Sequence, residues 1–318
     1  MLRTVLTQVE GVRAVLDASP LDGTPLDAEP PRVVDAEAVE NATNRSIPIV
    51  GGSIPGFGAF LDGRQDSRIV AWIGALTPLV IGTVSAGIQQ RDGRRLRSWG
   101  ETIVERRLYA PFARVDSDRL RRACHPLPVV DTLTRDDDPA SALHPAFLQE
   151  RARQAVLRDR EDAEQRVGAA WCAVAQVPLF VDGGIAGSDS MARSPLAIGV
   201  VKSHRTFYGD AEGMAAALGL GPAERTPVVR IAPRGRRPVY SWYLRLRDPA
   251  GHDALWGLVR IEVAETSDPT GRADLVSRWV LAERAPLAAP DARWDRMTYG
   301  VRAVEQALGA VARSGWRT

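Results

Sequence analysis

The stretch that most constrains the fold of this chain is an apolar run that ends in an aspartate and two glycines, Val177 to Gly184. A short apolar run bounded by turn-forming residues is typical of a buried strand, so the sequence predicts a strand that carries Asp182 at its carboxyl end. The glycines add no Cβ and let backbone or substrate approach that carboxylate. No Gly-Lys-Ser/Thr sequence follows, which favours a metal-binding or acid-base role for Asp182 over a phosphate-binding loop. An ordinary Asp-Gly turn is the alternative.

A second copy of this pattern lies earlier in the chain, where the apolar residues 57–61 lead into Asp62 and Gly63. Two further strand-like runs follow, residues 68–73 and 79–86, and glycine and proline lie in the links between runs. An acid-bearing meander, then a long helical region, then another acid-bearing strand resembles the plan of the ribonuclease H-like nucleases. The sequence therefore predicts an α/β fold, with a ribonuclease H-like mixed sheet flanked by helices and a long helical arm.

Length and composition are those of a globular protein, because 45% of the 318 residues are apolar and a chain of this length can bury a large core. Residues 1–47 are predicted to form a short helix over residues 1–15 and an acidic, proline-rich segment over residues 16–47, and residues 48–318 to form the folded domain. The two cysteines, Cys124 and Cys172, have no metal-ligand spacing, which argues against a zinc finger or a disulfide framework. No apolar run of about 18 residues and no signal-peptide core occur, so we expect a cytoplasmic protein with no membrane partner.

The distribution of charge is more informative than its net value of +2, because the basic residues are almost all arginines and Lys202 is the sole lysine. Lys202 ends the apolar run that follows Asp182, where a compact ammonium group suits a phosphate contact. The arginine-dense residues 94–107 are predicted to be helical, and the basic character continues through residues 114–122. These arginines are expected either to follow a phosphate backbone or to form a solvated face with acidic partners.

The longest helical pattern covers residues 145–176, with apolar residues on one stripe of the helix. Glu164 falls on that stripe, where a carboxylate is costly unless it is paired or binds a cation. Glu161, one turn earlier, is the rival candidate, and salt bridges with neighbouring arginines are the alternative explanation for either residue. A closing helix over residues 296–312 places Glu305 near an apolar stripe of its own.

Three acids on separate elements and a fourth on the closing helix match the needs of a two-metal site. Two divalent ions roughly 4 Å apart must be bridged and flanked by carboxylates to hold the attacking water and the leaving oxygen of phosphodiester hydrolysis. Oxygen ligands favour Mg²⁺ or Mn²⁺. The four histidines are scattered along the chain and offer no competing His/Ser/Asp or Cys/His arrangement.

As an ordered set, these motifs resemble the NurA nucleases, DNA end-processing enzymes with a ribonuclease H-like core that act beside a HerA-type hexameric ATPase. The resemblance implies a metal-dependent DNA nuclease with exonuclease and single-strand endonuclease activity, in end resection and repair or in defence against phage and other foreign DNA. It implies two Mn²⁺ or Mg²⁺ ions, a homodimer on the ATPase ring, a phosphate contact at Lys202 and a site lined by Tyr299. The matching segments are Phe60 to Gly63, Leu179 to Gly183, Gly199 to Ser203, Tyr240 to Tyr243, Val259 to Glu262 and the helix after Tyr299.

Among the carboxylates, the resemblance implies that Asp62 and Asp182 are metal ligands. It assigns the helix carboxylate to Glu164, with Glu161 as its rival. Glu305 is expected to complete the coordination and, with the helix carboxylate, to orient the attacking water.

Two other classes of function stay open. The chain departs from the family pattern at Arg64, Gly184 and Glu305. These departures allow a catalytically inactive adaptor that keeps the fold and the ATPase contact. An actin-like sugar or acyl kinase is the other class, because that fold also places strand-borne Asp-Gly turns near phosphates. Cleavage assays with metal separate the nuclease from the adaptor, and ATP binding identifies the kinase.

Overall fold

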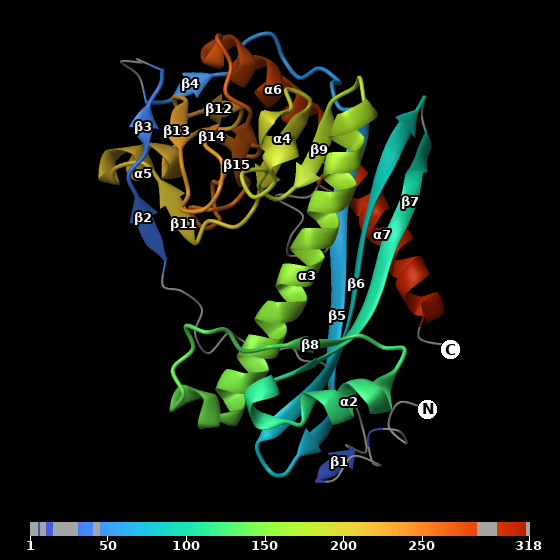
Figure 1. The fold of residues 1–318 in the computed structure, drawn as a ribbon. Helices are drawn as coiled ribbons and strands as arrows, with labels where there is room; N and C mark the ends of the chain where they lie inside the picture. The colour runs from blue at the N-terminus through green and yellow to red at the C-terminus, as the bar shows by residue number, and fades with distance from the viewer. Residues whose placement is uncertain are drawn as a thin grey trace.

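A computed structural model describes residues 6, 11–14, 31–40, 45–93, 95–284 and 298–315 of the chain (Figure 1). The described strands are β1 (Val12–Ala14), β2 (Arg32–Val34), β3 (Glu37–Ala38), β4 (Ile47–Pro48), β5 (Ala59–Ile73), β6 (Thr77–Asp92), β7 (Arg95–Ala110), β8 (Val129–Asp131), β9 (Leu179–Asp182), β10 (Ala197–Val201), β11 (Thr206–Tyr208), β12 (Glu224–Arg225), β13 (Val229–Ile231), β14 (Val239–Arg245) and β15 (Leu258–Val263). The described helices are α2 (Ser117–Cys124), α3 (Pro145–Val174), α4 (Asp189–Arg193), α5 (Ala211–Leu218), α6 (Pro269–Glu283) and α7 (Tyr299–Gly315).

Thirteen of these strands form one mixed sheet with the central order β3-β13-β14-β15-β10-β9-β5-β6-β7-β8. β9 is parallel to both of its neighbours, β5 and β10, whereas β5, β6 and β7 form an antiparallel meander. α6 and α7 pack on one face of the sheet around Phe60 and Trp242. α3 and α4 pack on the other face around Leu61 and Trp171. The prediction of a mixed α/β sheet flanked by helices is therefore confirmed.

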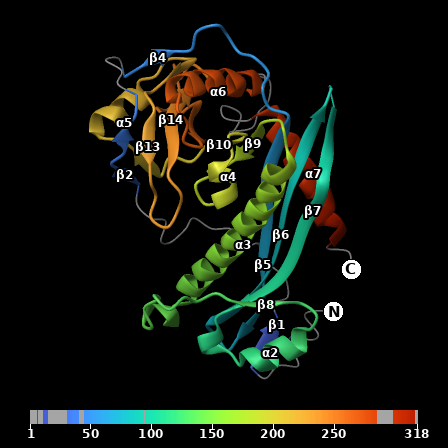
Figure 2. The same cartoon turned by 45° about the horizontal axis from the view of Figure 1, so that its top comes forward.

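The molecule has two parts (Figures 1 and 2). We call residues 179–284 the head, and we call the distal parts of β5, β6 and β7, together with β8, α2 and the first half of α3, the arm. The three long strands contain 15, 16 and 16 residues and run from the head to the far end of the arm. The described helices include none that combines the length and the apolar character needed to cross a membrane.

The predicted boundary at the first Asp-Gly step is wrong. The sequence pattern ends a strand at Asp62 and Gly63, yet β5 continues through both residues to Ile73. β6 pairs with this whole stretch, and Gly63 lies opposite Ala86. The partner strand supplies hydrogen bonds along the polar middle of β5, so the loss of apolar residues there does not end the strand.

The predicted helix over residues 94–107 is also wrong, because residues 95–110 form β7 and Arg94 lies outside the described residues. The side chains of β7 alternate between the two faces of the sheet, as in any strand. Arg107 points toward α3, where its Nη1 donates to Asp159 at 2.8 Å. Pairing with β6 thus overrides the local helical pattern. A role in following a phosphate backbone stays a prediction for the other arginines of this region.

The helix predicted over residues 1–15 is wrong for Val12–Ala14, which form β1 and pair with β5. Most other residues of that range lie outside the described residues, as do residues 15–30. Residues 31–40 of the predicted acidic segment contain β2 and β3, which pair with β11 and β13. Two strand pairings therefore attach this part of the segment to the head.

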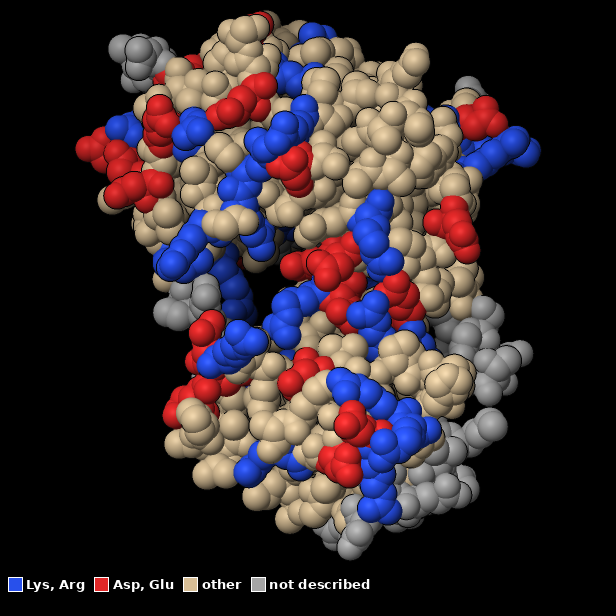
Figure 3. Space-filling model, viewed as in Figure 1, with Lys and Arg blue, Asp and Glu red and all other residues tan. Residues whose placement is uncertain are grey.

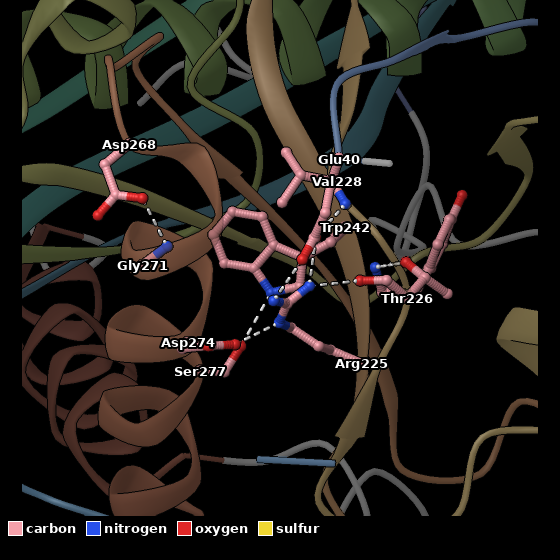
Figure 4. Close-up of polar contacts among 10 residues, drawn as sticks. Glu40, Arg225, Thr226, Val228, Trp242, Asp268, Gly271, Asp274 and Ser277 are labelled. Carbon is pink, nitrogen blue, oxygen red and sulfur yellow. Dashed lines mark hydrogen bonds and ion pairs between the residues drawn. The ribbon is translucent and has the colours of Figure 1, made fainter. Parts of the chain in front are cut away.

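A buried ion-pair cluster fastens the same segment to the head (Figure 4). Arg225 is 0% exposed, and its Nη1 and Nη2 donate to the carboxylate of Glu40 at 2.7 and 3.0 Å. Its Nε donates to Asp274 of α6 at 2.7 Å. Glu40 also accepts a hydrogen bond from the backbone N–H of Val228 at 3.0 Å. Burial raises the pKa of Glu40, but the hydrogen bonds and the charge of Arg225 outweigh burial and hold that pKa below its ordinary value.

We expect Glu40→Gln to lower the free energy of unfolding at pH 7 by about 1 to 3 kcal/mol, because Arg225 loses a charged partner. The pKa of Glu40 is lower in the folded state, so its stabilisation is present above the unfolded pKa and is lost as the pH falls through the folded pKa. The difference between the two proteins should therefore shrink below about pH 4. Urea denaturation at several pH values measures it.

The matched control for this prediction is Glu212→Gln. Glu212 also pairs with an arginine, Arg45, but its side chain is 78% exposed. Exposed pairs contribute little, so we expect a change within about 0.5 kcal/mol. Equal losses in the two variants would contradict a special role for the buried cluster.

Candidate functional site

Two carboxylates lie side by side where β9 ends. In the parallel pairing of β5 with β9, Phe60 lies opposite Phe180, and their ring centroids are 5.9 Å apart. Asp62 and Asp182 follow two residues later on the two strands, so they point to the same face as the two rings. The prediction that Asp182 ends its strand is confirmed.

Glu164 of α3 is the third carboxylate, and it approaches from the other face of the sheet, on which α3 packs. β9 ends at Asp182 while β5 continues, so among the described residues β5 has no strand partner on that side between Asp62 and Ala71, where β1 begins to pair. Glu164 lies against Gly63 there, because a Cβ added at position 63 would be 2.1 Å from Oε1 of Glu164. Arg160, one helical turn earlier, donates a hydrogen bond to the same oxygen. Gly63 therefore serves as space for a carboxylate, and it forms no turn.

Lys202 lies next to Asp182, one residue after β10. Its Nζ is 2.8 and 2.9 Å from the two carboxylate oxygens of Asp182. The parallel register of β9 and β10 pairs Asp182 with Val200, which brings the end of β10 beside the end of β9. The side chains of Lys202 and Asp182 are 26% and 19% exposed, so solvent and small ions reach this ion pair.

Negative charge exceeds positive charge around Asp62, which is 5% exposed. Burial, followed by the charges of Asp182 and Glu164, raises the pKa of Asp62 to about 8, although Lys202 acts to lower it. Burial also raises the pKa of Glu164 to about 7, against the opposing charge of Arg160. Carboxyl groups that titrate near neutral pH in this way are concentrated at functional sites.

Of the other three predicted site residues, Glu161 interacts with this group, and Glu305 and Tyr299 lie on α7. Glu161 is on α3 next to Glu164, and its charge contributes to the raised pKa of Glu164. Glu305 is half-buried on α7, and the adjacent Val304 packs on the same sheet face as the two aspartates. Tyr299 is the first residue of α7 and is 66% exposed. The roles of these residues stay predictions.

Within the residues that the structure describes, no three His, Cys, Asp or Glu side chains are arranged to hold a metal ion as they stand. Two of the carboxylates form ion pairs with basic side chains, Asp182 with Lys202 and Glu164 with Arg160. The chemistry of the donors nevertheless fits a divalent cation, because Asp62 is a buried acid among further acids and carboxylate oxygens are preferred by Mg²⁺ and Mn²⁺.

The contact between Arg160 and Glu164 is the salt bridge with a neighbouring arginine that their four-residue spacing offers as the alternative explanation for Glu164. One residue beside the site was not predicted from the sequence. Glu262 of β15 is 3% exposed and accepts a hydrogen bond from the backbone N–H of Ile185 at 2.8 Å. The sequence around Glu262 gives no signal for this contact, because its partner lies in a turn after another strand.

Figure 3 shows a hollow between the head and the arm beside α3, with Lys and Arg side chains and also Asp and Glu side chains at its edge. Near the end of β10, the exposed residues Arg32 and Arg205 are adjacent, since the backbone N–H of Arg32 donates to the carbonyl oxygen of Arg205 at 2.9 Å. Arg205 follows Lys202, the basic partner of Asp182, by three residues along the chain. Such a distribution suits a polyanionic ligand.

Comparisons of this chain with known proteins find similarity at the level of the structure. No protein-family model matches the sequence. No curated protein matches it either. Among solved structures, the NurA nuclease from Sulfolobus solfataricus is similar over 80% of this chain and 80% of its own, with a TM-score of 0.46 and 9% sequence identity.

Proposed function

We propose that this chain is a divalent-metal-dependent deoxyribonuclease with a ribonuclease H-like, NurA-type core. One observation carries the proposal: Asp62 and Asp182 lie side by side at the open edge of β5, with Glu164 as a third carboxylate. Separate elements bring these acids together around a buried position with excess negative charge. Oxygen donors in such a position support the binding of Mg²⁺ or Mn²⁺.

In the proposed reaction, Asp62 and Asp182 would hold the divalent ions, and Glu164 and Glu305 would complete the ligand set and orient a water molecule. The bound ions supply Lewis-acid stabilisation of the phosphate and lower the pKa of a bound water. Lys202 is a compact cation on a flexible stem, so it is suited to exchange its contact with Asp182 for one with a phosphate oxygen. The exposed arginines near the end of β10 are suited to the DNA backbone.

The test is cleavage of end-labelled single- and double-stranded DNA in the presence of Mn²⁺, Mg²⁺ or EDTA. We expect metal-dependent products from the wild type, and a rate lower by about a thousand-fold for Asp182→Asn, which keeps the side-chain size and removes a ligand charge. Asp189→Asn is the matched control, because Asp189 is an acid with a 63% exposed side chain on the neighbouring α4. Intact DNA in every lane, from a folded wild type, would refute autonomous nuclease activity.

The raised pKa values make metal binding dependent on pH. Metal ions bind ionised carboxylates, so below about pH 8 a cation must displace the proton of Asp62, and below about pH 7 that of Glu164 as well. We expect the Mn²⁺ affinity to rise between about pH 6 and pH 8 and to level off above this range. Calorimetric titration in two buffers of different ionisation enthalpy counts the protons released. An affinity independent of pH would contradict the assignment of these carboxylates as ligands.

The sequence resemblance to the NurA nucleases supports a wider proposal. The chain would form a homodimer, work with a HerA-type hexameric ATPase in the cytoplasm, and act on DNA ends in repair or in defence. Light scattering after size exclusion measures the dimer. Co-purification with the ATPase, with and without DNA, measures the complex.

A second candidate is a catalytically inactive adaptor of the same ATPase complex. One observation favours it: Lys202 and Arg160 already compensate the charges of Asp182 and Glu164. An adaptor binds DNA or the ATPase, while added metal yields no cleavage. The assay described above therefore decides between the two candidates.

A further inference from the structure

We infer that Glu262 is a positioning residue for Asp182, acting through the backbone turn that joins β9 to α4. The inference rests on the proposed function of the Asp62 and Asp182 site. Glu262 lies on β15, which is separated from β9 by β10. Its neighbours Ile261 and Val263 pack on the sheet face that carries the two aspartates, so Glu262 points to the opposite face. Both of its carboxylate oxygens are engaged, one by Arg260 and the other by amides of the turn, so its effect on the site passes through the turn.

The turn begins directly after Asp182. Gly183 has a φ of 139°, a conformation that favours glycine, and its N–H donates to the carbonyl oxygen of Val200 at 3.1 Å. The next two buried amides, those of Ile185 and Ala186, both donate to Oε2 of Glu262, at 2.8 and 3.3 Å. A single side-chain oxygen thus accepts two backbone N–H groups that have no access to water. Loss of that acceptor leaves both amides unsatisfied.

Glycines create the space for this contact. A Cβ added at Gly184 would lie 2.9 Å from Oε2 and 3.2 Å from Oε1 of Glu262. A Cβ added at Gly199, which lies opposite Glu262 on β10, would lie 2.8 Å from the carbonyl oxygen of Gly183. The sequence interpretation of Gly184 as an approach route to the Asp182 carboxylate is incomplete, because its missing Cβ admits the Glu262 carboxylate.

Arg260 fixes the other oxygen of Glu262. Its Nη1 donates to Oε1 at 2.6 Å, and its guanidinium lies 4.8 Å from the ring centroid of Tyr208. The side chains of Arg260 and Glu262 are 9% and 4% exposed. Oε1 of Glu262 therefore accepts from Arg260, and Oε2 accepts from the turn. A carboxylate accepts stronger hydrogen bonds than a neutral group does, which suits it to hold a turn of this kind.

Asp182 is thus held from two sides of the sheet. Lys202 contacts its carboxylate on one face, and Glu262 fixes the backbone that follows it on the other. Partners that orient a ligand in this indirect way change metal affinity by about 10- to 100-fold when they are removed.

The test uses Lys202 as a reporter, because it is the only lysine in the chain and lysine labelled with carbon-13 gives a single side-chain spectrum. The proteins compared are the wild type, Glu262→Gln and Glu262→Ala. The control is Glu283→Gln, which removes another buried acid, 5% exposed and paired with Arg91 at 2.9 and 2.8 Å. Two quantities are read for each protein: the Lys202 Cε chemical shift in EDTA, and the Mn²⁺ concentration that half-broadens that signal.

We expect the Lys202 signal to move in both Glu262 variants, more in Glu262→Ala than in Glu262→Gln, which retains an acceptor oxygen. The half-broadening Mn²⁺ concentration should rise about tenfold or more in Glu262→Ala. Glu283→Gln should match the wild type in both quantities, even if its unfolding midpoint falls.

Wild-type chemical shifts and wild-type Mn²⁺ dependence in folded Glu262 variants would overturn the inference. If Glu262→Ala does not fold, Glu262→Gln decides it by the same readings. If Mn²⁺ broadens no signal of the wild type, the proposed metal site is wrong. The chemical shift in EDTA then still decides whether Glu262 positions Asp182.

Discussion

Asp62→Asn is expected to abolish metal-dependent cleavage and to stabilise the metal-free protein at alkaline pH. The pKa of Asp62 is raised to about 8 in the folded protein, against about 3.9 in an unfolded chain. Between these values the folded state holds more protons than the unfolded state, so the contribution of Asp62 to stability falls as the pH rises toward 8. Asparagine keeps the size of the side chain and carries no charge at any of these pH values.

We expect the stability of Asp62→Asn relative to the wild type to rise by about 4 kcal/mol between pH 5 and pH 8.5 in EDTA, because about three pH units of that range lie below the folded pKa and each corresponds to about 1.4 kcal/mol. Asp66→Asn is the control, because Asp66 lies on the same strand with a side chain 30% exposed and 3.5 Å from Arg68. The control should change by less than about 0.5 kcal/mol at both pH values. Denaturant unfolding at the two pH values measures the gain, and a relative stability of Asp62→Asn that does not change between them would show that the charge of Asp62 is compensated.

A gain in stability of Asp62→Asn at pH 8.5 would show that the Asp62 carboxylate lowers the stability of the metal-free protein while it serves the proposed function. The same uncompensated charge that weakens the metal-free protein is what a divalent cation neutralises on binding. Addition of Mn²⁺ should therefore stabilise the wild type at pH 8.5 and leave Asp62→Asn much less affected. This comparison checks the two halves of the prediction in one experiment.

Gly63→Ala is expected to disrupt the site although it adds only one methyl group. Its Cβ would lie 2.1 Å from Oε1 and 2.8 Å from Cδ of Glu164, so the Glu164 side chain must move. That movement separates Glu164 from Arg160 and from the two aspartates. We expect a loss of about 1 to 3 kcal/mol in stability and a loss of cleavage comparable to that of Glu164→Gln.

A double-mutant cycle tests the cause. In the Glu164→Ala background no carboxylate meets the new methyl group, so Gly63→Ala should be close to neutral for stability there. Gly187→Ala is the control, because its Cβ would meet only the flexible end of Gln165, at 3.3 Å. An equally large loss from Gly63→Ala in both backgrounds would show that the strand, rather than the carboxylate, requires the glycine.

The two Asp-Gly steps show how far local sequence carries. Both follow an apolar run, and both predict the end of a strand, yet only Asp182 ends one. The difference lies in pairing: β6 accompanies β5 past Asp62, and the chain after Asp182 turns away toward α4. Which partner runs beside a strand is decided by residues far away in the sequence.

Long-range periodicity was the more reliable signal. The helix predicted over residues 145–176 is α3, and its apolar stripe places Glu164 against the sheet as predicted. The role of Glu262 could not be predicted from the sequence, because β15 shows no such periodicity. Its strand is buried on both faces, so the sequence pattern does not show which side chains meet a turn on a neighbouring strand.

β5 connects the Asp62 carboxylate to the far end of the arm without an intervening loop. From Asp62 to Ile73 the strand is continuous, with one irregularity between Ile69 and Ala71, and its last residues pair with β1. At about 3.3 Å per residue this distance is about 36 Å. A displacement of β5 at the far end of the arm is therefore expected to move the whole paired strand, including Asp62. A molecule that binds the far end of the arm would therefore be able to change the position of the Asp62 carboxylate, because no loop separates the two within β5.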